Sequence, residues 1–174
     1  NILAVALWST EEARAVLAAG AAGVRRLLGR FEALLRHEER RIREAATWSI
    51  GRIHDPRAPM SLMRAANSDL PSVRVLACQA LGASGDSMVL STLVDKLEHD
   101  RVGEVRVAAA IGLGKLGRPE AVPALIQALR SQTGSIARAS ALAIGAIGNP
   151  AAAEPLLEAL FRGDDALASA AAWA

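Results

Sequence analysis

The sequence contains little of what β-rich, disulfide-stabilised or membrane-spanning proteins are built from. Tyrosine is absent, aromatic residues make up 3% of the 174 residues, and Cys78 is the single cysteine. One cysteine excludes an internal disulfide, and scarce aromatic residues disfavour a large β-sandwich or barrel. No apolar run reaches the roughly 18 residues that a membrane-spanning helix needs. We therefore expect no membrane association and a reducing compartment, with the cytoplasm as the default location.

Alanine and leucine supply most of what is present. They account for 38 and 23 residues, and hydrophobic residues make up 52% of the chain, which excludes a disordered protein. Both residues are strong helix formers. The net charge of +2 is too small to indicate nucleic-acid binding by itself. The sequence begins at Asn1 without an initiator methionine or the basic start of a signal peptide, so we interpret it as a fragment.

The chain repeats one unit of about 31 residues. Glycines recur at intervals of 31, 31, 32 and 31 residues, and a second series of mostly glycines follows three residues later. A β-branched anchor residue precedes each of the last four glycines of the first series by nine residues. The first series is Gly20, Gly51, Gly82, Gly114 and Gly145, and the anchors are Ile42, Val73, Val105 and Ile136. Such periodicity predicts a single repeat domain over residues 1–174, with partial units at both ends. The full units are 11–40, 41–71, 72–103, 104–134 and 135–165.

Each unit is predicted to be a hairpin of two helices, A and B. Helix A carries an apolar stripe of helical period, and the second glycine ends it in a left-handed cap. Helix B begins at once, with an N-cap from Asp55, Asp86 or Asn149, whereas Arg118 provides none. We expect the repeat glycines and nearby alanines to let successive A helices approach closely. The recurring arginines are interpreted as structural, bonded to helix-end carbonyls or loop carboxylates; they are Arg43, Arg74 and Arg106.

The repeat pattern resembles a known family. Val-Arg-x-x-Ala-Ala-x-x-Leu-Gly-x-x-Gly-Asp/Asn-Pro, followed by a leucine-rich helix, is similar to the short bacterial HEAT-like repeats of the phycobilisome-lyase type. The match covers roughly residues 11–174 and is best over 105–160. The resemblance implies an all-α, right-handed α/α superhelical solenoid of about five hairpins, with B helices on the concave side. It also implies a non-catalytic scaffold that binds a protein partner. Because some members attach bilins, a chromophore-handling accessory protein is the alternative.

Motifs for catalysis and metal binding are not convincing. Residues 112–117 match G-x-G-x-x-G, but two of these glycines belong to the repeat and no strand precedes them. His37-Glu38 begins like H-E-x-x-H, but Arg41 replaces the second histidine. We therefore predict no enzyme activity, no catalytic residue, no metal site and no cofactor.

The concave face is the first candidate binding surface. Each helix B carries a repeat leucine eleven residues after the first-series glycine, at Leu62, Leu93, Leu125 and Leu156, with Phe31 in the first unit. The positions five before, one before and two after this residue are expected to point away from the core. The residues singled out are Arg26, Arg30, Arg57, Arg64, Asp95, Gln127 and Glu158. They change from basic to acidic along the chain, a gradient that would orient a partner of mixed charge. Ordinary solvated helix surface is one alternative. Nucleic-acid binding by the N-terminal arginines is another, disfavoured by the scarcity of aromatic residues.

The convex face is the second candidate. Six residues after each anchor position come Leu17, Trp48, Gln79, Ile111, Leu142 and Trp173, and two residues after it come Val75 and Val107. If these residues face outward, they form an apolar ridge that could dock a protein partner or another domain of the same chain. The alternative is that neighbouring A helices bury much of it. Apolar residues at both array ends also make self-association through those ends possible.

Overall fold

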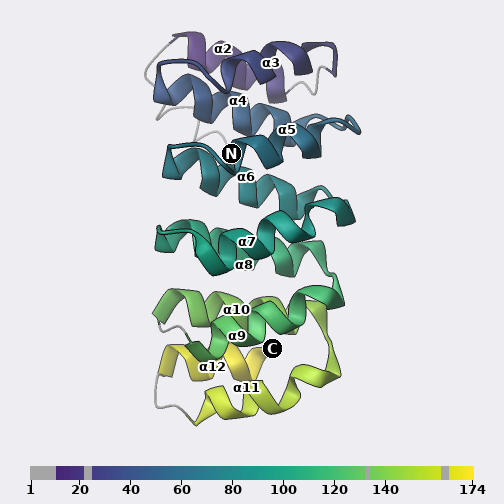
Figure 1. Cartoon of the computed structure of the whole chain (residues 1–174), viewed down its shortest axis with the longest axis vertical. Coiled ribbons are helices and arrows are strands. Elements are labelled where there is room, and N and C mark those ends of the chain that lie inside the picture. The colour runs from purple at the N-terminus through teal and green to yellow at the C-terminus, as the bar shows by residue number, and fades with distance from the viewer. Residues whose placement is uncertain (1–10, 22–24, 132–133, 162–164) are drawn as a thin grey trace. The chain divides into compact units, whose positions relative to one another are not determined.

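The computed structural model describes residues 11–21, 25–131, 134–161 and 165–174, and these ranges form helices without any strand (Figure 1). None of the helices described is long and apolar enough to cross a membrane. The α-helices are α2 (Glu11–Ala21), α3 (Leu28–Leu34), α4 (Arg40–Arg52), α5 (Ala58–Ala65), α6 (Pro71–Ala83), α7 (Leu90–His99), α8 (Gly103–Leu116), α9 (Val122–Ser131), α10 (Gly134–Ile147), α11 (Ala153–Leu160) and α12 (Asp165–Trp173).

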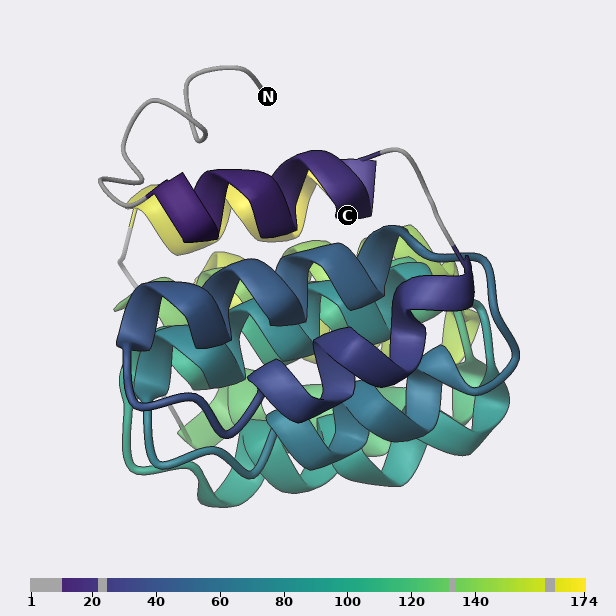
Figure 2. The ribbon, with the colours of Figure 1, turned by 90° about the horizontal axis from the view of Figure 1, so that it is seen from above.

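The chain divides into two compact units. The first spans Asn1–Ala80 and the second spans Leu81–Ala174. In the first unit, α4 packs against α2 on one side and against α3 and α5 on the other (Figure 2). In the second unit, α10 packs against α8, α9 and α12, and α11 packs against α12. Each unit therefore contains A and B helices that alternate along the chain as predicted, and in the second unit a B helix packs against the A helix that follows it, as α7 does against α8 and α9 against α10.

The ends of the A helices confirm the predicted caps. Gly85, Gly117 and Gly148 adopt φ angles of 69°, 67° and 69°, in the left-handed region that favours glycine. The predicted N-caps are also present. The Asp86 side chain accepts a 3.0 Å hydrogen bond from the Met88 amide, and the Asn149 side chain accepts one of 3.0 Å from the Ala151 amide. Asp55 accepts an equivalent bond of 2.9 Å from the Arg57 amide, and Arg118 makes no side-chain cap.

Helix B begins directly after the predicted cap residue, but in the second unit its first turn is a 3₁₀ helix rather than an α-helix. These turns lie at Ser87–Val89, Pro119–Ala121 and Pro150–Ala152. The capping residue closes this tight turn with its own carbonyl, as in the 3.0 Å bonds from the Ala121 amide to Arg118 and from the Ala152 amide to Asn149. The α-helix starts only after this turn.

Helix A packs as the apolar stripe predicts. On α8, Val105, Ala108, Ala109, Gly112, Leu113 and Leu116 are all buried. Leu125 and Leu129 of α9 are fully buried, and α9 packs against α10, the A helix that follows it in the chain. In the first unit, a buried cluster of Ala13, Leu17, Ile42 and Ala45 joins α2 to α4.

Repeat glycines lie where successive A helices meet. A Cβ added at any of them would fall 2.4–2.8 Å from the nearest atom of the following A helix or its end, closer than real Cβ atoms come. The pairs are Gly51 with Ala80, Gly82 with Gly112, Gly114 with Ala143, and Gly145 with Ala174. The predicted role of these glycines in close helix contact is therefore confirmed.

Candidate functional site

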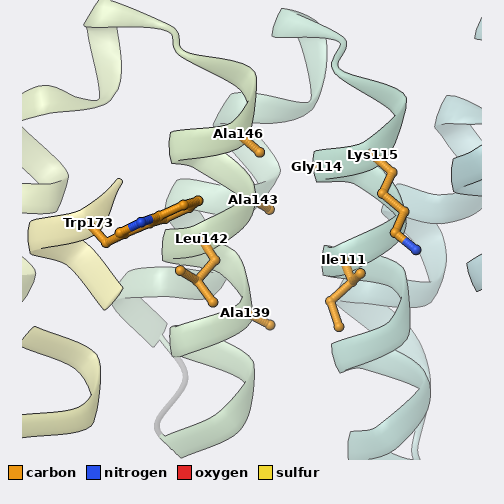
Figure 3. A pocket seen from close by; sticks show the side chains of 8 residues that line it. All are labelled: Ile111, Gly114, Lys115, Ala139, Leu142, Ala143, Ala146 and Trp173. Carbon is orange, nitrogen blue, oxygen red and sulfur yellow. The ribbon is translucent and has the colours of Figure 1, made fainter. Parts of the chain in front are cut away.

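Three A helices of the second unit form an apolar groove. Ile111 of α8, Leu142 of α10 and Trp173 of α12 are 41%, 37% and 73% exposed, which is high for large apolar side chains. They line a hollow of about 390 Å³, with Leu142 between Ile111 and the Trp173 indole ring (Figure 3). Ala139, Gly114, Ala143 and Ala146 also line it. Ile111, Leu142 and Trp173 occupy the same position in successive repeats, six residues after the anchor position. We call the hollow the apolar groove.

The groove has the same structural origin as the close helix packing. Gly114 and Ala143 line it and are also the pair that brings α8 and α10 together. Small side chains between the helices leave space beside the larger ones, which stand above them as ridges. The repeat therefore produces both a tight stack and an apolar hollow on its A-helix face.

Among the residues that the structure describes, Lys115 is the one charged residue that lines the apolar groove. It lies one helical turn after Ile111 on α8, and its side chain is exposed. Figure 3 shows it running along the α8 side of the hollow, opposite Trp173. A ligand with an apolar surface and an acidic edge would complement this arrangement.

The predicted ridge does not extend evenly into the first unit. Leu17 was expected to face outward, but it is buried, with 4% exposed. The reason is that Glu11 occupies the anchor position of α2, so the stripe of Ala13 and Leu17 faces α4 instead. Trp48 is half-buried against the same cluster, and the Arg52 guanidinium lies 5.5 Å from its ring centre.

Other ridge positions also differ from one another. Val75 of α6 and Val107 of α8 are half-buried, whereas Gln79 is exposed. A patch that is both exposed and apolar is therefore found in the second unit, at Ile111, Leu142 and Trp173.

The helix-B residues singled out by the sequence are all exposed: Arg26, Arg30, Arg57, Arg64, Asp95, Gln127 and Glu158. The expectation for the position just before the repeat leucine is wrong in three repeats, since Ser61, Ala124 and Pro155 are buried. This position faces the neighbouring hairpin: the Ser61 hydroxyl donates a hydrogen bond to the Glu32 carboxylate of α3.

Ion pairs offset much of the expected charge gradient. Arg57 makes two side-chain bonds of 3.0 Å to Asp55, and Arg64 lies 3.3 Å from Glu32. At the acidic end, Arg130 makes two 3.0 Å bonds to Glu158. Asp95 is 3.0 Å from the Lys96 ammonium group and 3.3 Å from His99. The helix-B face is consequently more neutral than the residues singled out by position suggest.

Sequence reasoning missed the partners Glu32 and Arg130. Arg130 lies five residues after its repeat leucine and Glu158 lies two after the next, so they are 28 residues apart rather than 31. A search for opposite charges at this offset on successive B helices would have found the pair.

Two repeat arginines hold one inter-helix loop. Arg43 of α4 donates bonds of 2.7 and 3.3 Å to the Asp69 carboxylate. Arg74 of α6 donates bonds of 3.0 and 3.3 Å to the backbone carbonyls of Ser68 and Asp69. Arg106 is half-buried, and its Nε has no hydrogen-bond partner among the residues described.

The Arg43–Asp69 pair predicts a weak acid sensitivity of the first unit. Hydrogen bonding from Arg43 is the main cause that lowers the pKa of Asp69 below its usual value. A group whose pKa falls on folding stabilises the native state above its unfolded pKa of about 3.9, and this contribution disappears as the pH falls through the native pKa. Because Asp69 is exposed, the effect is small.

The measurement is the urea midpoint as a function of pH for the wild type and for Asp69→Asn. We expect the wild type to be more stable at neutral pH and the two midpoints to converge as the pH falls below 4. Arg43→Ala should return the pKa of Asp69, followed by NMR, towards its ordinary value. An unchanged Asp69 titration in Arg43→Ala would contradict the assignment.

The G-x-G-x-x-G stretch has no phosphate-binding geometry. Gly112 and Gly114 lie buried inside α8, where their amides belong to a helix rather than to a loop after a strand. Cys78 is buried, and the residues described contain no group of three histidine, cysteine or acidic side chains that could hold a metal ion.

Comparisons with known proteins agree on the fold. A family model for HEAT repeats matches four overlapping ranges, 9–81, 27–107, 59–142 and 90–174. A structure of the CpcE–CpcF complex of phycocyanin lyase from Nostoc sp. PCC7120 has a TM-score of 0.69 at 19% identity, over 98% of this chain and 73% of that one.

Two further solved structures are similar. YibA of Escherichia coli gives a TM-score of 0.67 at 19% identity, over 91% of this chain and 61% of its own. An engineered protein gives a TM-score of 0.62 at 20% identity, over 97% of this chain and 92% of its own. A search of curated proteins finds no significant match. At these identities the similarities show the fold alone, which is that of an all-helical repeat protein.

Proposed function

The chain belongs to the HEAT-repeat family, and we propose that it is a non-catalytic scaffold that binds a protein partner through the apolar groove of α8, α10 and α12. HEAT repeats generally serve as protein-interaction scaffolds, because stacked helices present an extended surface. The observation that carries the choice of face is the clustering of Ile111, Leu142 and Trp173, three large side chains that remain exposed around one hollow.

Energetic considerations favour this groove over the helix-B face. Hot spots of protein interfaces are apolar or aromatic side chains in pockets, and tryptophan is among the most enriched. Arg57, Arg64 and Glu158 already have ion-pair partners on their own unit, so a new partner would have to compete with these contacts. The same pairs weaken the alternative that the N-terminal arginines bind nucleic-acid phosphates.

The test compares two substitutions that add the same charge. Leu142→Glu places a carboxylate in the apolar groove, whereas Gln127→Glu adds one on the exposed helix-B face. Proteins captured from an extract of the source organism by immobilised wild-type protein are identified by quantitative mass spectrometry. The affinity of a specific partner is then measured with each variant.

We expect Leu142→Glu to weaken binding by at least about 30-fold, the effect of losing a hot-spot contact of about 2 kcal/mol. Gln127→Glu should bind like the wild type, and circular dichroism should show that both variants are folded. The proposal fails if Leu142→Glu retains the wild-type affinity, and a selective loss with Gln127→Glu would assign binding to the helix-B face.

A further inference from the structure

The first unit contains a polar hollow that the proposed function does not use. Residues of α3, α4 and α5 and of the loop that follows α5 line it, and its volume is about 830 Å³. This is within the range of about 300–1,000 Å³ that is typical of ligand pockets. We call it the arginine hollow, because three arginines and two carboxylates line it: Glu32, Arg36, Arg43, Arg64 and Asp69.

Ion pairs leave one positive charge in the arginine hollow. Arg43 donates bonds of 2.7 and 3.3 Å to the Asp69 carboxylate, and the Arg64 guanidinium lies 3.3 Å from the Glu32 carboxylate. Arg36 is exposed, and its guanidinium has no hydrogen bond or ion pair to any residue that the structure describes. The hollow therefore has a net charge of one and a guanidinium whose donors are unused.

A comparison with the second unit shows why Arg36 has no partner. Arg130 and Glu158 lie on successive B helices, 28 residues apart, and two bonds of 3.0 Å join them. Arg36 and Arg64 have the same separation and occupy the same two positions of the first two repeats. Two cations thus stand where the second unit joins opposite charges. An anion between them would relieve their repulsion.

Small side chains on α3 provide the space for a ligand. Gly29 and Ala33 line the arginine hollow, and a Cβ at Gly29 would have no heavy atom within 4 Å. The same two positions on α5 are occupied by Met60 and Arg64, which are much larger. The hollow exists because α3 lacks such side chains.

Exposure at these two positions is a property of the B helices themselves. In the second unit, α9 contacts a B helix on either side, α7 and α11. Pro123 and Gln127 occupy the two positions on α9, and both are exposed. Neighbouring hairpins therefore do not cover these positions, and a ligand has access to them.

We propose that the arginine hollow binds a carboxylate side chain of an acidic peptide segment, held by Arg36 and Arg64. A guanidinium presents forked N–H donors that match a planar carboxylate. Arg64 has five such donors, and its side chain is 60% exposed, so it can bind the ligand and keep its contact with Glu32.

The charge and size of the hollow select this ligand. A phosphate group carries up to about two negative charges, which exceeds the single net positive charge and opposes the carboxylates of Glu32 and Asp69. The volume of about 830 Å³ is far larger than a carboxylate group, and the absence of side chains at Gly29 leaves room for a peptide backbone. The site belongs to the first unit, so it does not depend on the apolar groove of the second.

A nuclear magnetic resonance titration of the isotopically labelled chain at low ionic strength tests the proposal. The probe is an acetylated and amidated pentapeptide with glutamate between two pairs of alanines, and its control has glutamine in place of glutamate. We expect saturable shifts of the Arg36 and Arg64 side-chain N–H signals with the glutamate peptide and none with the glutamine peptide. Sodium acetate should bind at least about 10-fold more weakly, since it lacks the peptide's other contacts with the hollow.

Arg36→Gln should weaken binding of the glutamate peptide by at least about 10-fold, because a charge-assisted hydrogen bond is lost. Arg30→Gln is the matched control: it removes the same charge from an exposed position of the same helix outside the hollow, and should bind like the wild type. Gly29→Met changes no charge but places a side chain in the open space, so it should also weaken binding.

Circular dichroism should show that all three variants are folded. Leu142→Glu alters the apolar groove alone and should bind the glutamate peptide like the wild type, so this proposal and the proposed function fail separately. Equal affinity for the two peptides, or acetate binding as tightly as the glutamate peptide, would overturn the inference. The same holds if Arg36→Gln retains the wild-type affinity or loses no more than Arg30→Gln.

Discussion

Gly82→Ala will lower the stability of the fold, although alanine is the better helix former. A Cβ at this position would lie 2.4 Å from the Gly112 Cα and 2.5 Å from its carbonyl oxygen. These are backbone atoms, so no side-chain rotation relieves the overlap, and α6 and α8 must move apart. Helix propensity returns about 1 kcal/mol, whereas overpacking at a backbone contact costs about 3 kcal/mol or more. We expect a net loss of about 2 kcal/mol.

Gly29→Ala is the matched control for this substitution. Gly29 is the second residue of α3, and a Cβ there would have no heavy atom within 4 Å. The same chemical change should therefore stabilise the protein by about 0.5–1 kcal/mol through helix propensity alone. Urea unfolding followed by circular dichroism at 222 nm measures both effects. If Gly82→Ala is as stable as the wild type, the two helices are not in direct backbone contact.

The positions of the repeat glycines were predictable because one physical requirement acts at every unit. Each A helix must approach the next, so a residue without a side chain recurs at the contact, at 51, 82, 114 and 145. Ile111, Leu142 and Trp173 could be grouped for the same reason, since equal positions on stacked helices lie in one row. The hollow beside them depends on how deeply the small alanine side chains lie between the helices, and a repeat pattern in the sequence does not determine that depth.

Failures of the sequence interpretation arose where contacts depend on offsets between units. Leu17 sits at the ridge position, but the first repeat has Glu11 in place of an apolar anchor, and the apolar stripe of α2 faces α4. The bonds of Arg130 to Glu158 join different positions of successive repeats. Such pairs are not found when only equivalent positions of successive repeats are compared. The 3₁₀ turns at the start of the B helices likewise reflect local backbone closure, which an apolar pattern does not encode.

Buried serines illustrate how two similar residues in the A helices can have opposite energetic roles. Ser49 of α4 and Ser140 of α10 are both fully buried. The Ser49 hydroxyl donates a 2.9 Å hydrogen bond to the Val16 carbonyl of α2, so it links two A helices. The Ser140 Oγ has no hydrogen-bond partner among the residues described. A buried hydroxyl without a partner costs the free energy of its lost hydration.

Ser140→Ala should therefore stabilise the fold, and Ser49→Ala should destabilise it. Removing the unpaired hydroxyl of Ser140 relieves a desolvation cost of about 1–3 kcal/mol, to which alanine adds a small gain in helix propensity. We expect a gain of about 1.5 kcal/mol. Losing the bond from Ser49 costs about 1 kcal/mol even after the same propensity gain.

Urea midpoints of the two variants and the wild type measure these changes, and the opposite signs make the pair its own control. Ser→Ala removes the same oxygen in both helices, so a common effect on helix propensity shifts both midpoints in one direction. Equal shifts would mean that the Ser140 hydroxyl is bonded in solution. A separation of about 2 kcal/mol or more between the variants would establish that the bond to Val16, rather than burial of the hydroxyl, makes serine favourable at position 49.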